Sequence, residues 1–421
     1  VPLVARVLFP GSTGRLSRSA GSLLARPPAT RLAIEHSSDA RLPDGTQAGY
    51  NVSEMTAIVR RLLEDIGFVS GFARLVAVIG HGSSSRNNPH ESAYNCGACG
   101  GGRGGPNGRV WAAMANDGRV RKALADQGIL IPPETWFLGG AVDTCGNTIE
   151  WFDTDCIPET HAADVRQLTA DYDAALAADA LERCRRFETA AGFGDPRDAR
   201  RHVQARADDL AEVRPELGHA ANAACLIGRR SRSRGLFLDR RAFLVSYDPT
   251  ADASAEVLTR TLAAVVPVCA GINLEYWFST VDGDRYGCGT KLPHNITGLL
   301  GVMDGHASDL RTGLPRQMVE LHEPLRLMVV VDGEPEVVRA ALEALPAVKQ
   351  LVDNEWIQLA AWDQHGDVWH VRDGTFQQHH PGVSRLPKVD QSVDWFAGRT
   401  GQLAPAVVLA GQLDDEGGLS W

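Results

Sequence analysis

A histidine and two cysteines stand in one unusually glycine-rich segment of the chain. His81 follows a short apolar run, and Cys96 and Cys99 come further along the same segment. Imidazole nitrogen and thiolate sulfur are ligands that zinc prefers in proteins. Seven of the twelve residues from Gly97 to Gly108 are glycine, and a backbone without Cβ atoms can approach a ligand closely or adopt a positive φ. The segment therefore predicts a zinc site made by His81 and Cys96, with Cys99 as a possible supporting residue.

The glycine-rich segment is also compatible with three roles that need no zinc. Backbone amides of a glycine-rich loop can bind phosphate, but no Gly-Lys-Ser or Gly-Lys-Thr follows here. A redox pair of the thioredoxin kind would stand at a helix N-terminus, whereas Cys99 is followed by further glycines. A purely structural role, with glycines in tight turns and small buried cysteines, also fits the composition.

The zinc site is incomplete on these residues alone. Tetrahedral zinc takes four ligands, and a catalytic site keeps three protein ligands and a water. His81 and Cys96 supply two. The further candidates within the chain are Cys99, His90, Cys145 and Cys156.

The elements that must position His81 follow an α/β pattern. A capping box at Asn51 and Glu54 predicts a helix that ends at Gly67. The run Leu75–Ile79 predicts a strand buried on both faces, and His81 follows its carboxyl end, where α/β proteins place their sites. We expect a helix over 109–127 and a second strand over 135–142.

The remainder of the chain continues the mixture of helices and strands. We expect helices over 162–191 and 336–345 and strands over 242–247, 325–331, 357–362 and 367–371. The predicted fold class is α/β, with a mixed sheet and flanking helices. The predicted domains are an irregular arm over 1–50, an α/β domain with the zinc segment over 51–160, and a helical segment plus an α/β region over 161–421.

Composition excludes several classes of protein. The 421 residues are 44% hydrophobic and 22% charged, which is typical of a globular chain. A net charge of −10 argues against nonspecific nucleic-acid binding, and we interpret the basic clusters 197–206 and 229–234 as solvated faces because no aromatic residues interleave them. The longest strongly apolar stretch, 262–272, is shorter than a membrane helix needs. Eight cysteines favour reduced thiols over a disulfide framework.

The segment GHGSSSRNNPHESAYNCGACGG closely resembles the signature of the DabA family, the zinc-binding subunit of an energy-coupled inorganic-carbon transporter. The resemblance continues through IPPETWFLGGAVDT, AEVRPELGHAANAA, INLEYWFSTVDGDRYGCGTKLPHNITGLLGVMDG and LRTGLPRQMVELHEPLRLMVVVD. It covers nearly the whole chain from Asn51.

The resemblance implies a metal centre like that of the β-type carbonic anhydrases. His81 matches the family's histidine ligand and Cys96 its second cysteine. The first cysteine and an Asp–Arg dyad belong to a Cys-x-Asp-x-Arg element that is absent from this chain. We therefore expect this chain to be the C-terminal part of such a protein, with the catalytic Asp and Arg upstream of it.

The activity implied is zinc-dependent hydration of CO2 to bicarbonate, because zinc lowers the pKa of bound water to about 7. The implied partner is a membrane ion-translocating subunit of the DabB type, which resembles antiporter-like dehydrogenase subunits, and the implied location is the cytoplasmic side of the cell membrane, as a peripheral protein. A rival interpretation is a non-catalytic scaffold in which zinc only staples the loop and the chain docks the membrane subunit. A third is a nucleotide-binding domain.

Overall fold

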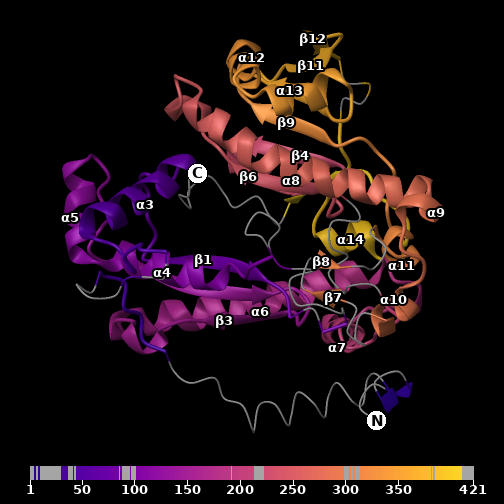
Figure 1. Ribbon diagram of the computed structural model, residues 1–421, viewed down its shortest axis with the longest axis horizontal. Helices are drawn as coiled ribbons and strands as arrows, with labels where there is room; N and C mark the ends of the chain where they lie inside the picture. Colours follow the sequence, from indigo (N-terminus) through magenta and orange to yellow (C-terminus); the bar gives the residue numbers. More distant parts are fainter. Residues whose placement is uncertain are drawn as a thin grey trace. The chain divides into compact units, whose positions relative to one another are not determined.

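The computed structural model describes residues 4–5, 8–9, 30–36, 41, 44–84, 86–87, 95, 101–190, 192–212, 222–297, 303–304, 307–308, 313–380, 382 and 385–409. The chain divides into two compact units (Figure 1). Unit 1 comprises residues 1–64, 68–180 and 200–210, and unit 2 comprises residues 65–67, 181–199 and 211–421. Each unit combines helices with β-sheet, which confirms the predicted α/β class.

Unit 1 is built on a three-stranded sheet of β1 (Leu75–Gly82), β2 (Trp136–Asp143) and β3 (Thr148–Trp151) in that order. β1 runs parallel to β2, and β3 is antiparallel to β2. The prediction that the first strand is buried on both faces is wrong, because β1 lies at the edge of the sheet and is half-buried through most of its length. β3 was not predicted.

The helices of unit 1 follow local capping signals. α3 (Val52–Asp65) begins at the predicted capping box, where the Asn51 side chain accepts from the Glu54 N–H and Glu54 accepts from the Asn51 N–H. The helix expected over 109–127 is instead two helices, α4 (Gly105–Asn116) and α5 (Gly118–Asp126). Asp117 is extended between them, and its carboxylate accepts from the Arg119 N–H, so it caps the second helix.

A hydrophobic core joins α3, α4, α5 and β2. Its fully buried members include Met55, Val59, Leu63, Met114, Leu124 and Phe137. On β3, the Trp151 ring packs edge-on against Tyr172 of α6 (Ala162–Cys184). α6 ends at Cys184, earlier than the helix expected over 162–191. The basic cluster 197–206 lies on α7 (Pro196–Arg206).

Unit 2 contains a six-stranded sheet in the order β12-β11-β10-β9-β4-β6. Neighbouring strands among β4, β6, β9 and β10 are parallel, whereas β11 and β12 are antiparallel to their neighbours. The strands are β4 (Ala224–Gly228), β6 (Ala242–Ser246), β9 (Met328–Asp332), β10 (Gln358–Trp362), β11 (Val368–Arg372) and β12 (Thr375–His379). The four strands expected in this region are confirmed, and β4 and β12 were not predicted.

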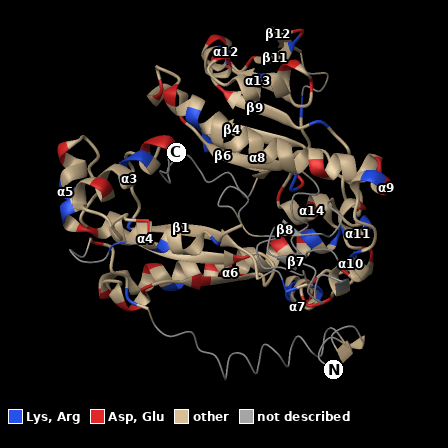
Figure 2. Ribbon diagram, in the orientation of Figure 1, with Lys and Arg blue, Asp and Glu red and all other residues tan. Residues whose placement is uncertain are grey.

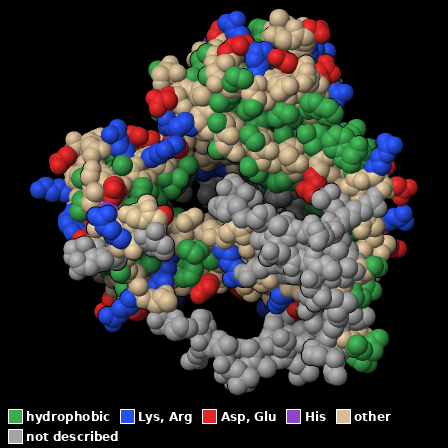
Figure 3. All heavy atoms as spheres, viewed as in Figure 1, with side chains coloured by type: hydrophobic (Ala, Val, Ile, Leu, Met, Phe, Trp, Pro, Cys, Tyr) green, Lys and Arg blue, Asp and Glu red, His purple; other side chains and the backbone are tan. Residues whose placement is uncertain are grey.

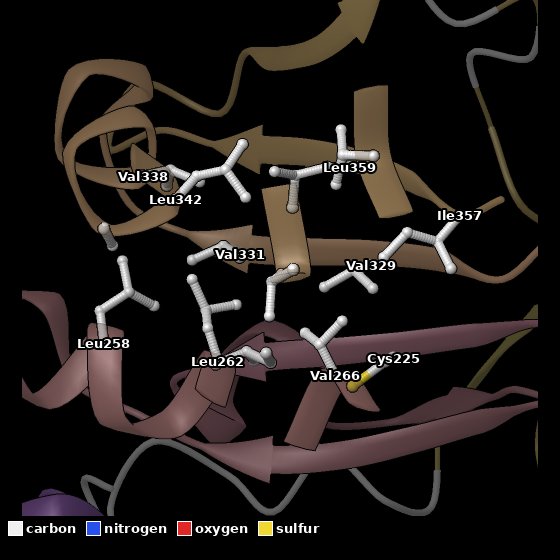
Figure 4. Close-up of a cluster of buried hydrophobic side chains, with 14 of the residues drawn as sticks. Cys225, Leu258, Leu262, Val266, Val329, Val331, Val338, Leu342, Ile357 and Leu359 are labelled. Carbon is white, nitrogen blue, oxygen red and sulfur yellow. The ribbon is translucent and has the colours of Figure 1, made fainter. Parts of the chain in front are cut away.

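Three helices complete the core of unit 2: α8 (Glu256–Val281), α12 (Pro335–Glu343) and α13 (Pro346–Asp353). Figure 4 shows how Leu262 and Val266 of α8 meet Val329 and Val331 of β9 in this core. The helix expected over 336–345 is thus α12, and α13 follows it directly. The smaller elements are β5 (Leu236–Phe237), α9 (Gly283–Tyr286), α10 (Lys291–Thr297), β7 (Met303–Asp304), β8 (Ala307–Ser308), α11 (Arg316–Val319), β13 (Lys388–Val389), α14 (Ser392–Phe396) and β14 (Ala406–Val408).

α8 extends well beyond the apolar stretch recognised at 262–272. It is long and apolar enough, by length and composition, to cross a membrane, although a core helix can satisfy the same criterion. One third of its most apolar part is buried inside the structure. Residues 261–274 carry no charge, so the middle of α8 is free of blue and red in Figure 2, and hydrophobic side chains gather along it in Figure 3.

Candidate functional site

His81 lies on β1, one residue before the carboxyl end of the strand, and pairs with Val142 of β2. Its side chain is exposed. His81 Nε2 and the Thr144 hydroxyl lie 3.3 Å apart in a hydrogen-bonding contact, and the Thr144 N–H donates to the Gly82 carbonyl. The imidazole is therefore accessible and has an oriented hydroxyl beside it, at the edge of the sheet where the sequence placed the site.

The residues after β1 are attached to the rest of unit 1 by side chains. The Ser83 N–H donates to the Asn95 carboxamide oxygen at 2.7 Å, and Cys96 is the next residue in the sequence. Arg86 forms an ion pair with the buried carboxylate of Asp208 at 3.3 Å. Sequence analysis missed these anchors because each joins residues that are far apart along the chain.

Of the candidate zinc ligands, His81, Cys145 and Cys156 are among the described residues. Cys96, Cys99 and His90 lie outside them. Within the described part of the chain, no three His, Cys, Asp or Glu side chains are grouped so that they could hold a metal ion. Cys145 is fully buried and Cys156 is exposed. The described residues thus offer one accessible imidazole, and Asn95, the neighbour of Cys96 in the sequence, is bonded to the same strand end.

Several glycines of the predicted site allow close packing of α4 on the sheet. A Cβ on Gly80 would lie 2.1 Å from the backbone of Gly104, and one on Gly105 would lie 2.7 Å from the Ala141 Cβ. A Cβ on Gly108 would lie 2.8 Å from the Val78 carbonyl oxygen. Since real Cβ atoms do not approach so closely, these glycines let the first turn of α4 contact the ends of β1 and β2. At these positions the glycines have the structural role that the composition suggested.

A pocket of about 400 Å³ opens at the carboxyl ends of β1 and β2. Its lining includes the apolar residues Pro106 and Phe152 and the ionisable residues Arg103, Asp143 and Glu150. Gly82, the residue after His81, forms part of the lining. The pocket therefore gives unit 1 a place for a small polar ligand next to the strand that carries His81.

The basic cluster 229–234 contains an ion-pair network that sequence analysis missed. Asp332, buried at the carboxyl end of β9, accepts from the Arg229 side chain at 2.7 and 2.9 Å and from Arg232 at 3.0 Å. Burial acts to raise the pKa of Asp332, but the hydrogen bonds and charge of Arg229 outweigh it and hold that pKa below its ordinary value. The expectation of a solvated face fits the exposed Arg230 and Arg234 but is wrong for Arg229 and Arg232.

Other aromatic and ionisable side chains of unit 2 differ in their exposure. Tyr276 is buried against His322, and Lys291 is buried on α10. The His294 side chain lies outside the described residues. His379 and His380 are exposed at the end of β12.

Comparison with known proteins gives a consistent result. The family model described as "Probable inorganic carbon transporter subunit DabA" matches residues 1–357. The chain is 50% identical to the "Probable inorganic carbon transporter subunit DabA" of Parafrankia sp. (strain EAN1pec), with 97% of this chain and 39% of the relative covered. It is 51% identical to "Probable inorganic carbon transporter subunit DabA 1" of Sorangium cellulosum (strain So ce56), with 97% and 40% covered.

The corresponding protein of Dechloromonas aromatica (strain RCB) is 49% identical, with 97% and 41% covered. The chain thus spans about two fifths of the length of the curated relatives that it matches. No solved structure matches the chain.

Proposed function

Because this chain belongs to the DabA family of probable inorganic carbon transporter subunits, we propose that it forms part of a subunit that takes up inorganic carbon. The finer proposal is zinc-dependent, vectorial hydration of CO2 to bicarbonate, carried out in a complex with a membrane ion-translocating subunit. The protein would act on the cytoplasmic side of the cell membrane as a peripheral subunit.

The observation that carries this proposal is the position of His81. Its exposed imidazole lies near the carboxyl end of a parallel strand, and the next residue, Gly82, lines a pocket of about 400 Å³. Ligand sites of α/β sheets form at these ends. His81 is also the residue that matches the family's histidine ligand, so geometry and resemblance point to the same side chain.

We propose that His81 and Cys96 hold the zinc, with Cys99 as a supporting residue. Bound zinc would acidify a water molecule to a hydroxide that can attack CO2 near neutral pH. The Thr144 hydroxyl would orient the His81 imidazole through its contact with Nε2. Asn95 would keep the neighbouring Cys96 near the strand end through its bond to Ser83.

The test is made in a full-length member of the family expressed with its membrane partner, at the histidine that aligns with His81. Substitution by alanine is expected to remove bound zinc and abolish accumulation of labelled inorganic carbon. The matched control is alanine substitution of the residue that aligns with His380, which is exposed at the end of β12. This variant is expected to retain its zinc and its uptake. Normal uptake without the His81 imidazole would refute the catalytic proposal.

The scaffold alternative is supported by the glycine contacts, because Gly80, Gly105 and Gly108 serve packing of α4. In that case zinc would only stabilise the segment. Substitution of the aspartate in the upstream Cys-x-Asp-x-Arg element of a full-length relative separates the two candidates. A scaffold retains carbon uptake, whereas a catalytic centre loses it while zinc stays bound.

A further inference from the structure

The pocket at the carboxyl ends of β1 and β2 combines one cation, two carboxylates (Asp143 and Glu150) and a buried hydroxyl. Arg103, Asp143 and Ser84 all line it. The parallel pairing of β1 with β2 brings Ser84 and Asp143 to one edge of the sheet, and Arg103, just before α4, lies against Gly82 at the same edge. Each of the three offers a different hydrogen-bonding function, so together they indicate which kind of ligand would match the pocket.

Arg103 supplies the positive charge. Its stem lies over Gly82, where an added Cβ would be 3.6 Å from the Arg103 Cγ, in ordinary van der Waals contact. The guanidinium has five N–H donors and stays charged at any pH that a folded protein tolerates. The adjoining α4 begins at Gly105, which also lines the pocket, and the start of a helix favours negative charge.

Asp143 is held in place by backbone groups on both sides. Its Oδ1 accepts from the Ser84 N–H at 2.9 Å and from the Cys145 N–H at 3.1 Å. An ionised carboxylate offers about four acceptor positions, so Asp143 retains capacity for a donor in the pocket. An anion that carries no hydrogen would be repelled by this carboxylate, whereas an anion with an O–H group could donate to it.

The Ser84 hydroxyl oxygen is buried and makes no hydrogen bond to any part of the chain that the structure describes. A buried polar group without a partner destabilises the fold, because it has lost its hydrogen bonds to water. Since Ser84 lines the pocket, a ligand or water there would offset this cost.

We propose that this pocket is a bicarbonate-binding site, in which Arg103 binds the charged oxygens and Asp143 accepts the bicarbonate hydroxyl. Inorganic carbon as the ligand class rests on the proposed function, and the assignment of these residues is independent of the zinc ligands. Bicarbonate is a small monoanion with one O–H donor, so it satisfies the cation and the carboxylate together. Nitrate and chloride match only the cation. The pocket therefore distinguishes bicarbonate from the other common monoanions by its acceptor.

The test is titration of this chain with ¹³C-labelled bicarbonate near pH 8, followed by NMR line broadening and repeated in the presence of a chelator. Arg103→Gln is expected to weaken binding about tenfold or more, the effect of losing a charge-assisted hydrogen bond, and Arg103→Lys to restore part of it. The matched control is Arg119→Gln. This removes an exposed arginine of unit 1 that pairs with Glu35 and Asp117 outside the pocket and leaves binding unchanged.

Competition with nitrate tests the role of Asp143. In the unaltered chain, nitrate at equal concentration is expected not to displace bicarbonate. Asp143→Asn keeps an oxygen for the backbone donors but replaces the acceptor by an amide, so nitrate should then compete. Equal displacement by nitrate before and after the substitution, or an unchanged affinity in Arg103→Gln, would overturn the proposal.

The outcome is separable from that of the proposed function. Suppose that bicarbonate binding depends on Arg103, but that a full-length relative takes up inorganic carbon without zinc. The bicarbonate site would then be supported and zinc-dependent catalysis refuted. If instead the zinc content of the relative depends on the histidine that aligns with His81, while Arg103→Gln leaves bicarbonate affinity unchanged, zinc binding at His81 would be supported and the bicarbonate site refuted. Thermal unfolding of each variant shows whether a loss of binding reflects a loss of fold.

Discussion

The backbone N–H of Ser83 and the side-chain oxygen of Asn95 are joined by a hydrogen bond of 2.7 Å. Ser83 directly follows β1, and Asn95 directly precedes Cys96. The bond therefore holds Asn95, and with it the start of the Cys96 segment, at the end of β1. His81, the other proposed zinc ligand, lies on that strand. This single contact relates two parts of the glycine-rich segment that sequence spacing alone could not connect.

This contact leads to a prediction about Asn95. Asn95→Ala removes the acceptor and is expected to lower the zinc affinity of the chain several-fold, because the approach of Cys96 to His81 becomes less restricted. Asn95→Asp keeps an oxygen that can accept from Ser83 and should bind zinc more tightly than the alanine variant. Competition with a coloured chelator measures both. Equal affinities in the alanine variant and the unaltered chain would show that the bond does not position the ligand.

A second prediction concerns zinc itself. Two protein ligands bind zinc more weakly than a complete set, so the chain alone is expected to bind it weakly, and His81→Ala and Cys96→Ser should each remove what is bound. Atomic absorption after gel filtration measures the metal content. About one zinc per chain that survives removal of the His81 imidazole would mean that other residues hold the metal.

The packing of α4 gives a prediction about stability. Gly80→Ala would place a Cβ 2.1 Å from the Gly104 backbone, so the free energy of unfolding is expected to fall by about 3 kcal/mol or more. Gly118→Ala is the matched control, because nothing lies within 4 Å of its added Cβ, and its stability should stay the same or rise by about 0.5–1 kcal/mol. Urea unfolding compares the two. A Gly80 variant as stable as the control would contradict the close contact.

The ion pairs of Asp332 predict a pH dependence. Asp332→Ala leaves Arg229 and Arg232, both partly exposed, without their carboxylate, and is expected to cost about 2–3 kcal/mol at pH 7. The pKa of Asp332 is lower in the folded chain than its ordinary value, so its contribution is complete above the unfolded pKa of about 4. The contribution disappears as pH falls through the folded pKa.

Urea unfolding across pH measures the difference between the unaltered chain and Asp332→Ala. The difference should be constant from about pH 5 to 8 and shrink below about pH 4. The control is Asp353→Ala, which removes an exposed i,i+4 pair with Lys349 and should cost less than about 0.5 kcal/mol. A difference that grows at low pH would have the wrong sign for a carboxylate with a lowered pKa.

The sequence predicted those helices and strands whose formation depends on residues close together in the chain. Asn51 and Glu54 specify the start of α3 because each satisfies a backbone N–H of the other. The apolar runs of β1, β2, β9 and β10 were recognised from composition and length alone. β4 (Ala224–Gly228) was missed although it is as long as β9 and β10. The break at Asp117 was missed because helical periodicity continues through it.

The α/β class, the family and the choice of His81 as a candidate zinc ligand could all be predicted from the order of residues along the chain. These depend on short-range periodicity and on long blocks of residue identity. Three other relationships become visible in the fold alone. Gly80 accommodates the backbone of Gly104, Arg103 and Asp143 line one pocket, and Arg229 binds the carboxylate of Asp332, far along the chain. The physical reason is that such contacts are set by how β-strands pair and how helices pack on them, and spacing along the chain does not encode which distant residues will meet.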